Sequence, residues 1–290
     1  SCQGTPMINH LLTASILLLV YSPGARATFA DATSLFRSWL APPHRLVRAL
    51  LAMYVVVPVV AACMGLMLEL AGPVRVALLA VAVAPIPPIL PGKQLKGGGS
   101  RAHAFGLLVA VSLCAVVLVP LTVGILGHLF GMSSSFGPIK VARLIGVTIL
   151  IPLLAGLTLR RFAPRWAPFV ATWASRIGTV MLAACAALVL YEARHVLDGL
   201  VGDGSLLAIA ALAIIAIGAG HWLGGPQPDE RSNLAIASAM RHPGIAIAVA
   251  TANDPGEPRV SAAILLYVLV ATVATSLYVA VTRRRHAESA

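Results

Sequence analysis

The sequence predicts an all-α polytopic membrane protein with about nine transmembrane helices arranged in two inverted repeats, two of the helices being discontinuous. Of the 290 residues, 59% are hydrophobic and only 11% are charged, whereas soluble domains are about one quarter charged. Apolar runs of the length needed to cross a bilayer, about 20 residues, recur along the whole chain. Lys and Arg residues collect in alternate loops between these runs, as expected for membrane spans of fixed orientation.

Nine charge-poor runs can be followed along the chain, and residues 7–290 are expected to form a single transmembrane domain. The first run is interpreted as a span, although its apolar centre and the Ala-Arg-Ala stretch also resemble a signal peptide. The sixth run contains Arg176, which is expected to face other protein or an interface. The runs cover residues 7–25, 49–68, 76–90, 104–126, 141–159, 166–191, 205–223, 229–254 and 260–281.

The distribution of basic residues predicts the orientation of the spans. With the N-terminus outside, fourteen Lys and Arg residues fall on the cytoplasmic side and five fall on the opposite side. Cytoplasmic loops attract Lys and Arg, so this asymmetry predicts a cytoplasmic C-terminus in a plasma membrane, such as the bacterial inner membrane. The net charge of +11 is therefore interpreted as topology. No basic or aromatic platform indicates a nucleic-acid partner.

Two runs, the third and the eighth, are interrupted by Pro and Gly, at about residues 76–101 and 230–254. Each lies one run before a long uncharged run, so the interruptions hold matching places in two similar groups. This arrangement points to a secondary transporter built from inverted repeats, in which broken helices cross near the bilayer midplane. The other interpretation is that the prolines only kink continuous spans, which membrane helices tolerate.

The residues at the two interruptions are the first candidates for a substrate site. Pro85 and Pro88 belong to a group of four prolines within a seven-residue stretch. Arg241 could bind a substrate carboxylate through its planar guanidinium, stand as a fixed cation in an ion site, or pair with carbonyls freed by Pro243. His242 could take part in proton coupling, because imidazole titrates near neutral pH, or form ordinary hydrogen bonds.

Further polar candidates flank the interruptions. Asn233 and Ser238 could line a polar crevice or form hydrogen bonds across helices. Lys93 and Gln94 could form the cytoplasmic mouth of an anion path or belong to a solvated loop. The predicted substrate-binding residues are Pro85, Pro88, Lys93, Gln94, Asn233, Ser238, Arg241, His242, Pro243 and Gly244.

The sequence offers no cluster of metal-binding or catalytic residues. The four cysteines are far apart and no CxxC or Cys/His spacing occurs. Asp229 and Glu230, at the start of the eighth run, are expected to stabilise the N-terminal end of a helix. An enzyme would need a clustered acid, base or nucleophile within the spans. We therefore expect no metal, no cofactor and no enzymatic activity.

The segment 232–242, with the sequence SNLAIASAMRH, resembles the broken-helix motif of the bile acid:sodium symporter family, within a larger group that also contains arsenite exporters. The likeness extends over nearly the whole of residues 7–285 in span order and charge pattern. It implies a core domain with two crossing helices, packed on a panel domain, with the substrate in the crevice between them.

The chain departs from this family at the positions that the resemblance assigns to sodium binding. Where sodium-coupled members carry a glutamate it has Ala237, and where they carry glutamine and asparagine it has Arg241 and His242. Residues 85–91 replace the family's Gly-Gly and Ser-Asn pattern. Sodium needs several oxygen ligands, so these departures imply that sodium is not required.

The leading hypothesis is a secondary active transporter that moves a small organic anion across the lipid bilayer by alternating access, without depending on sodium. Proton coupling, exchange and facilitated diffusion all stay open. One alternative is a sodium-coupled symporter of the same family with displaced ion ligands, so the coupling ion is either a proton or sodium, if there is one. The other is a membrane receptor or sensor that binds a ligand without moving it.

Overall fold

All the elements in the part of the chain that the structure describes are helical, and no strand occurs there. The structure is a computed structural model. It describes residues 4–28, 44–87, 90–96, 101–131, 138–192, 204–253 and 257–288. The helices, with two π-helical turns labelled η, are α1 (Gly4–Arg26), α3 (Arg45–Leu51), η1 (Ala52–Val56), α4 (Val57–Met67), α5 (Gly72–Val83), α6 (Leu90–Lys96), α7 (Arg101–Leu129), α8 (Pro138–Ile145), η2 (Gly146–Leu150), α9 (Ile151–Phe162), α10 (Ala167–Glu192), α12 (Ser205–Leu223), α13 (Pro228–Ala239), α14 (Pro243–Asn253) and α15 (Pro258–Glu288).

Six helical stretches among the described residues are long and apolar enough to cross a membrane, which indicates an integral membrane protein. The helix Gly72–Val83 is apolar but shorter, because it stops two residues before Pro85. A bilayer core requires about 20 helical residues, so this segment cannot cross it as a continuous helix. The six stretches are Arg45–Met67, Ala104–Leu129, Ala167–Leu188, Ser205–Leu223, Pro228–Thr251 and Arg259–Arg284.

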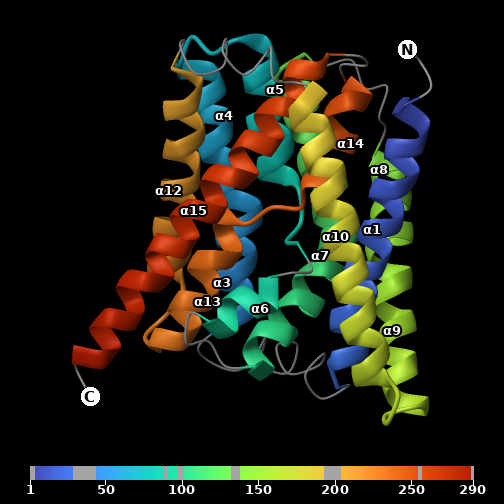
Figure 1. Cartoon of the computed structure of the whole chain (residues 1–290). Helices are drawn as coiled ribbons and strands as arrows, with labels where there is room; N and C mark the ends of the chain where they lie inside the picture. The colour runs from blue at the N-terminus through green and yellow to red at the C-terminus, as the bar shows by residue number, and fades with distance from the viewer. Residues whose placement is uncertain are drawn as a thin grey trace.

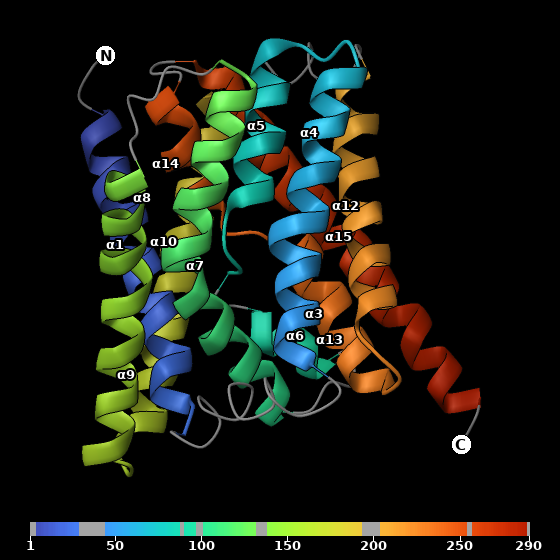
Figure 2. The same ribbon diagram turned by 180° about the vertical axis from the view of Figure 1, so that it is seen from behind.

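The helices lie roughly side by side along one axis, and the two termini lie at opposite ends of the bundle (Figure 1). Figures 1 and 2 show two groups of helices. In one group, α1 packs against both α9 and α10. In the other, α12 packs against α13, and α15 packs against α5 and α12. The chain therefore forms a smaller and a larger helical group that meet along one side.

Two helices are broken halfway along the bundle. After α5 the chain becomes extended at Ala84, and the next described helix is α6. After α13 it becomes extended at Met240 before α14 starts. Pro85 and Pro243 explain both breaks, since Pro lacks an N–H and biases the preceding residue toward extended backbone. The backbone N–H of His242 donates to the Pro85 carbonyl at 2.8 Å. The two unwound segments thus cross and contact each other in the middle of the molecule (Figure 1).

Two further prolines act through π-helical turns. The turn η1 ends two residues before Pro58, and the turn η2 ends at the same distance before Pro152. In a π-turn residue i+5 donates to residue i, as the Val57 N–H does to the Ala52 carbonyl. Pro58 has no N–H to continue this pattern, so the carbonyl of Met53 is left without an intrahelical donor.

Candidate functional site

Arg241 is the centre of the candidate site. Its side chain is only 2% exposed, between the two unwound segments. Nη1 donates to the carbonyl of Ala84 at 3.1 Å, and Nη2 donates to the carbonyl of Met53 at 3.0 Å. These two contacts hold the guanidinium against a helix break and against a π-turn. Its buried Nε has no hydrogen-bond partner among the described residues.

The carbonyls that Arg241 binds are free because of local sequence. Ala84 follows the last turn of α5, where the helix ends and carbonyl groups lack helical donors. Met53 lies five residues before Pro58, so its carbonyl has no donor in the π-turn. An unpaired carbonyl buried in a membrane protein costs free energy unless a donor reaches it. The arginine therefore satisfies two backbone acceptors that prolines created.

A cavity of about 630 Å³ lies beside Arg241, between α10 on one side and α6 and α15 on the other. Its lining residues include three cations, Arg241, Lys93 and Arg283, and none of its described lining residues is acidic. Leu182 of α10 and several residues of α15 form its apolar wall. The other lining residues are Pro87, Gly92, Met240, Pro243, Val268, Thr272, Ser276 and Val279. The arrangement is suited to an anion with an apolar body.

Lys93 and Gln94 are on the helix α6 rather than in a solvated loop. The Lys93 ammonium donates to the carbonyl of Thr272 at 2.9 Å and to the hydroxyl of Thr275 at 2.7 Å, so it fastens α6 to α15. Gln94 is fully buried, and its Nε2 donates to the carbonyl of Asn233 at 2.9 Å. Of the two, Lys93 lines the cavity and Gln94 holds α6 against α13.

Asn233 and Ser238 do not line this cavity, unlike what the sequence interpretation allowed. Both side chains are fully buried in α13, and their polar atoms have no hydrogen-bond partner among the described residues. The Ser238 hydroxyl lies against α12 at Gly220, where a Cβ would come within 2.6 Å of it. The absence of a side chain at Gly220 lets α12 and α13 approach closely. The Ser238 side chain therefore packs against α12 and does not line the cavity.

The residues after Arg241 form the other edge of the crossing. Pro243 lines the cavity, whereas the buried His242 contacts the first interruption through its backbone, to the Pro85 carbonyl. Gly244 lies against α1, because a Cβ at that position would collide with Cδ1 of Ile16. Ile16 and Gly244 therefore bring the smaller helical group into direct contact with the crossing. Pro88 lies outside the described residues.

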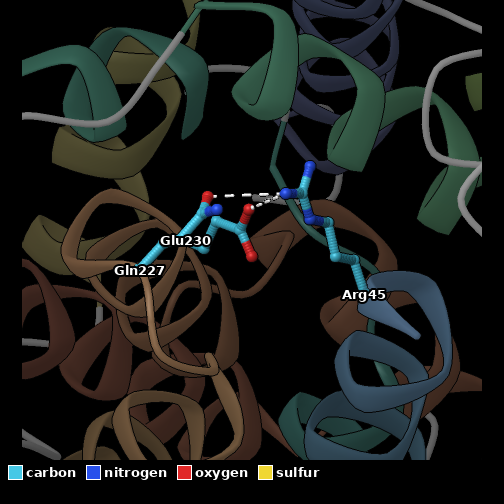
Figure 3. Close-up of polar contacts among 3 residues, drawn as sticks. All are labelled: Arg45, Gln227 and Glu230. Carbon is cyan, nitrogen blue, oxygen red and sulfur yellow. Dashed lines mark hydrogen bonds and ion pairs between the residues drawn. The ribbon is translucent and has the colours of Figure 1, made fainter. Parts of the chain in front are cut away.

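Asp229 and Glu230 lie in the first turn of α13, the position at which acidic residues are expected to stabilise the N-terminal end of a helix. The start of α13 has no side-chain cap hydrogen bond. Instead the buried carboxylate of Glu230 forms an ion pair of 2.6 Å with Arg45 of α3, which also donates to Gln227 at 3.4 Å (Figure 3). The sequence pattern could not reveal this pair, since its members are separated by most of the chain. It fastens the start of α13 to the start of α3.

Within the described ranges, no group of three or more His, Cys, Asp or Glu side chains could hold a metal ion. The polar groups at the crossing are instead the guanidinium of Arg241, the imidazole of His242, backbone carbonyls and backbone amides. A guanidinium and backbone amides are groups that can bind or orient an anion.

Comparison with known proteins adds one finding. The model of the Sodium Bile acid symporter family matches residues 13–199, more than half of the chain. The matched part begins within α1, includes α5, α6, α7 and α10, and ends before α12 and the second interruption. A search of curated proteins found no match.

Proposed function

Because the chain belongs to the Sodium Bile acid symporter family, we propose that this membrane transporter is a secondary active transporter that moves a small organic anion by alternating access. The observation that carries the proposal is the buried residue Arg241, which lines a cavity together with Lys93 and Arg283. The cavity volume of about 630 Å³ lies within the range of small-molecule sites, roughly 300–1,000 Å³.

The substrate class follows from charge and from the hydrogen-bond donors that are left over. Arg241 uses Nη1 and Nη2 for backbone carbonyls, and its Nε remains as a buried donor without a described partner. A desolvated cationic donor is a strong binding group for a carboxylate or a sulfonate. The apolar lining at Leu182 and Val268 suits the rest of an organic anion. This supports a single anionic group held at the crossing, with the body of the substrate along α15.

Alternating access is supported by the two helical groups. We assign α1, α8, α9 and α10 to a panel domain and the remaining helices to a core domain that carries both broken helices. In this assignment, nine passes form two inverted repeats, and α5–α6 corresponds to α13–α14. The cavity lies where α10 of the panel faces α15 of the core. Movement of the core past the panel would expose the crossing to one side of the membrane at a time.

The orientation follows from basic residues at one end of the bundle. The ends of α3, α9 and α15 on the C-terminal side carry Arg45, Arg48, Arg160, Arg161 and Arg283. We assign this side to the cytoplasm, with the N-terminus outside, in a plasma membrane such as the bacterial inner membrane. The cavity, which includes Arg283, would then open inward.

The same contacts support transport that does not require sodium. A sodium ion needs several oxygen ligands, and backbone carbonyls at helix breaks commonly supply them. Here the guanidinium of Arg241 already occupies the carbonyls of Ala84 and Met53. The fixed positive charge would take the place of a coupling cation. Transport would proceed by exchange, facilitated diffusion or proton coupling.

Reconstitution tests the proposal. A thermal-shift screen of carboxylates, sulfonates and bicarbonate first identifies an anion that stabilises the purified protein. Counterflow of that anion into sealed proteoliposomes is expected, at equal rates with and without a sodium gradient. Binding without counterflow would instead indicate a receptor, and a strict sodium requirement would indicate a symporter with displaced ion ligands.

A further inference from the structure

Arg176 is a charged residue on the outer face of α10 that the transport site does not use. It is exposed, and so are its apolar neighbours Phe169, Trp173, Ile177 and Val180. In a membrane helix such a face contacts lipid, where an isolated cation is unfavourable. The position therefore calls for an anionic partner in the surroundings of the protein.

The aromatic residues on this face locate it at the edge of the bilayer. Trp166 directly precedes α10 and is 67% exposed, while Trp173 is 48% exposed two turns further on. Exposed Trp side chains collect at the level of the lipid headgroups. The rings of Phe169 and Trp173 pack edge to face, with centroids 6.3 Å apart. They form a rigid aromatic surface at this level.

The guanidinium of Arg176 points toward the same level. Its Cζ lies 5.6 Å from the ring centroid of Trp173, which is nearer the start of α10. The Cα of Arg176 is about 14 Å from the start of the helix, nine residues away at 1.5 Å each. Side chains of helices lean toward the N-terminus, so Arg176 extends back to the headgroup zone as a snorkelling arginine.

A second arginine approaches from the neighbouring helix. Nη2 of Arg26, at the end of α1, donates to the hydroxyl of Thr172 at 3.5 Å. Thr172 lies four residues before Arg176, which places the two on adjacent turns of the same helix face. One guanidinium from α10 packs on an exposed tryptophan, and a second, from α1, contacts Thr172 one helical turn before Arg176, a charge pattern complementary to a phosphate.

We propose that Arg176, Trp173 and Arg26 form a binding site for the headgroup phosphate of an anionic phospholipid. Arg176 would bind the phosphate through its planar fork while it stacks on Trp173, and Arg26 would contribute charge from α1. The acyl chains would lie along the apolar residues of α10. Because α1 and α10 belong to the smaller helical group, the lipid would anchor that group at the membrane surface. This inference does not depend on the identity of the transported substrate.

Fluorescence quenching by brominated lipid tests the site on the full-length protein. Replacing Trp39, Trp166 and Trp222 by Phe leaves Trp173 as the only reporter. The protein is reconstituted in phosphatidylcholine vesicles that contain brominated phosphatidylglycerol or, in parallel, brominated phosphatidylcholine. Stronger quenching by the phosphatidylglycerol is expected, with a relative binding constant of about fivefold for one basic side chain near an anionic headgroup.

Matched variants identify the cause of this preference. Arg176→Gln should remove most of the preference and leave only the part that Arg26 contributes, while Arg176→Lys, which keeps the charge, should retain more of it. A protein with Trp222 as the only reporter, which is 84% exposed and lies one residue before the end of α12, should show no preference. Equal quenching by the two lipids with Arg176 present, or an unchanged preference in Arg176→Gln, would overturn the proposal. So would loss of the preference on adding inorganic phosphate, which would indicate a free anion.

Discussion

Arg241 and Met53 are 188 positions apart in the sequence, yet Nη2 of Arg241 donates a hydrogen bond of 3.0 Å to the Met53 carbonyl. This contact joins the second interrupted helix to the π-turn before Pro58. A proline and an arginine that are far apart in the chain thus act on the same carbonyl group. The position of the guanidinium depends on both of them.

The first prediction concerns Pro58. The variant Pro58→Ala restores an N–H that can donate to the preceding turn, so Met53 gains a competing donor. Loss of one hydrogen bond of about 1 kcal/mol should weaken anion binding about fivefold. The free energy of unfolding should not fall, because Ala is the better helix residue. Titration calorimetry with the screened anion measures the first effect, and denaturant unfolding the second.

Pro152→Ala is the matched control. Pro152 follows the π-turn η2 with the same spacing, but it lies in α9 and frees a different carbonyl. Anion binding should be unchanged in this variant. Equal weakening by both substitutions would show that the π-turns act through general helix flexibility and not through Arg241.

The second prediction separates the two roles of Lys93, as a charge in the cavity and as a clamp between α6 and α15. Lys93→Met removes both and should weaken anion binding at least about threefold, since one of the cations that line the cavity is lost. Thr275→Val removes one acceptor at 2.7 Å and keeps the charge. It should lower stability by about 1 kcal/mol with near-normal binding. Similar loss of binding in both variants would show that the clamp, and not the charge, matters.

The third prediction concerns the ion pair of Glu230 and Arg45. Glu230→Gln removes the charge from a carboxylate that is 3% exposed, whereas Arg45 is 31% exposed. The expected loss of stability is roughly 1–3 kcal/mol, between the values for exposed and buried pairs. The neighbouring Asp229→Asn, with no ion pair among the described residues, should change stability little. Equal thermal unfolding of Glu230→Gln and Asp229→Asn would argue against a stabilising pair.

The fourth prediction concerns the contact of Gly244 with α1. A Cβ at residue 244 would collide with Cδ1 of Ile16, the end of a flexible side chain, so Gly244→Ala should fold but transport several-fold more slowly. Ile16→Val deletes that Cδ1 and alone costs about 1 kcal/mol. The double variant should recover most of the transport rate. Additive losses in counterflow would show that the two residues act independently.

The sequence predicts the breaks in the fold better than the contacts around them. Pro85 and Pro243 act on their own helices, so their effect follows from local chemistry. The burial of Arg241 within the bundle follows from the apolar residues that precede and follow it in the sequence. The hydrogen-bond partners of Arg241 cannot be predicted in this way, because Met53 and Ala84 offer backbone carbonyls that no side-chain pattern reveals.

For the candidate site too, the sequence predicts which residues lie near the helix breaks but not which side chains face the cavity. The sequence identifies Lys93 and Arg241 as cations near the helix breaks, and both residues line the cavity. Asn233 and Ser238 are polar residues on the same broken helix, but whether they face the cavity depends on how α12 packs. Gly220 determines that packing, and a single glycine in an apolar helix gives no signal of its partner. The ion pair between Glu230 and Arg45 also depends on how distant helices pack, so the sequence does not reveal it.

The central claim is that the guanidinium of Arg241 binds the anionic group of the substrate. The most direct measurement is the dissociation constant of the screened anion for wild-type protein, Arg241→Lys and Arg241→Gln, taken at a temperature where all three are folded. Thermal stability should fall in Arg241→Gln, because backbone carbonyls lose a donor. The account predicts that Arg241→Gln binds the anion at least about tenfold more weakly, or about 1.4 kcal/mol, with Arg241→Lys in between. An unchanged dissociation constant in folded Arg241→Gln would contradict it.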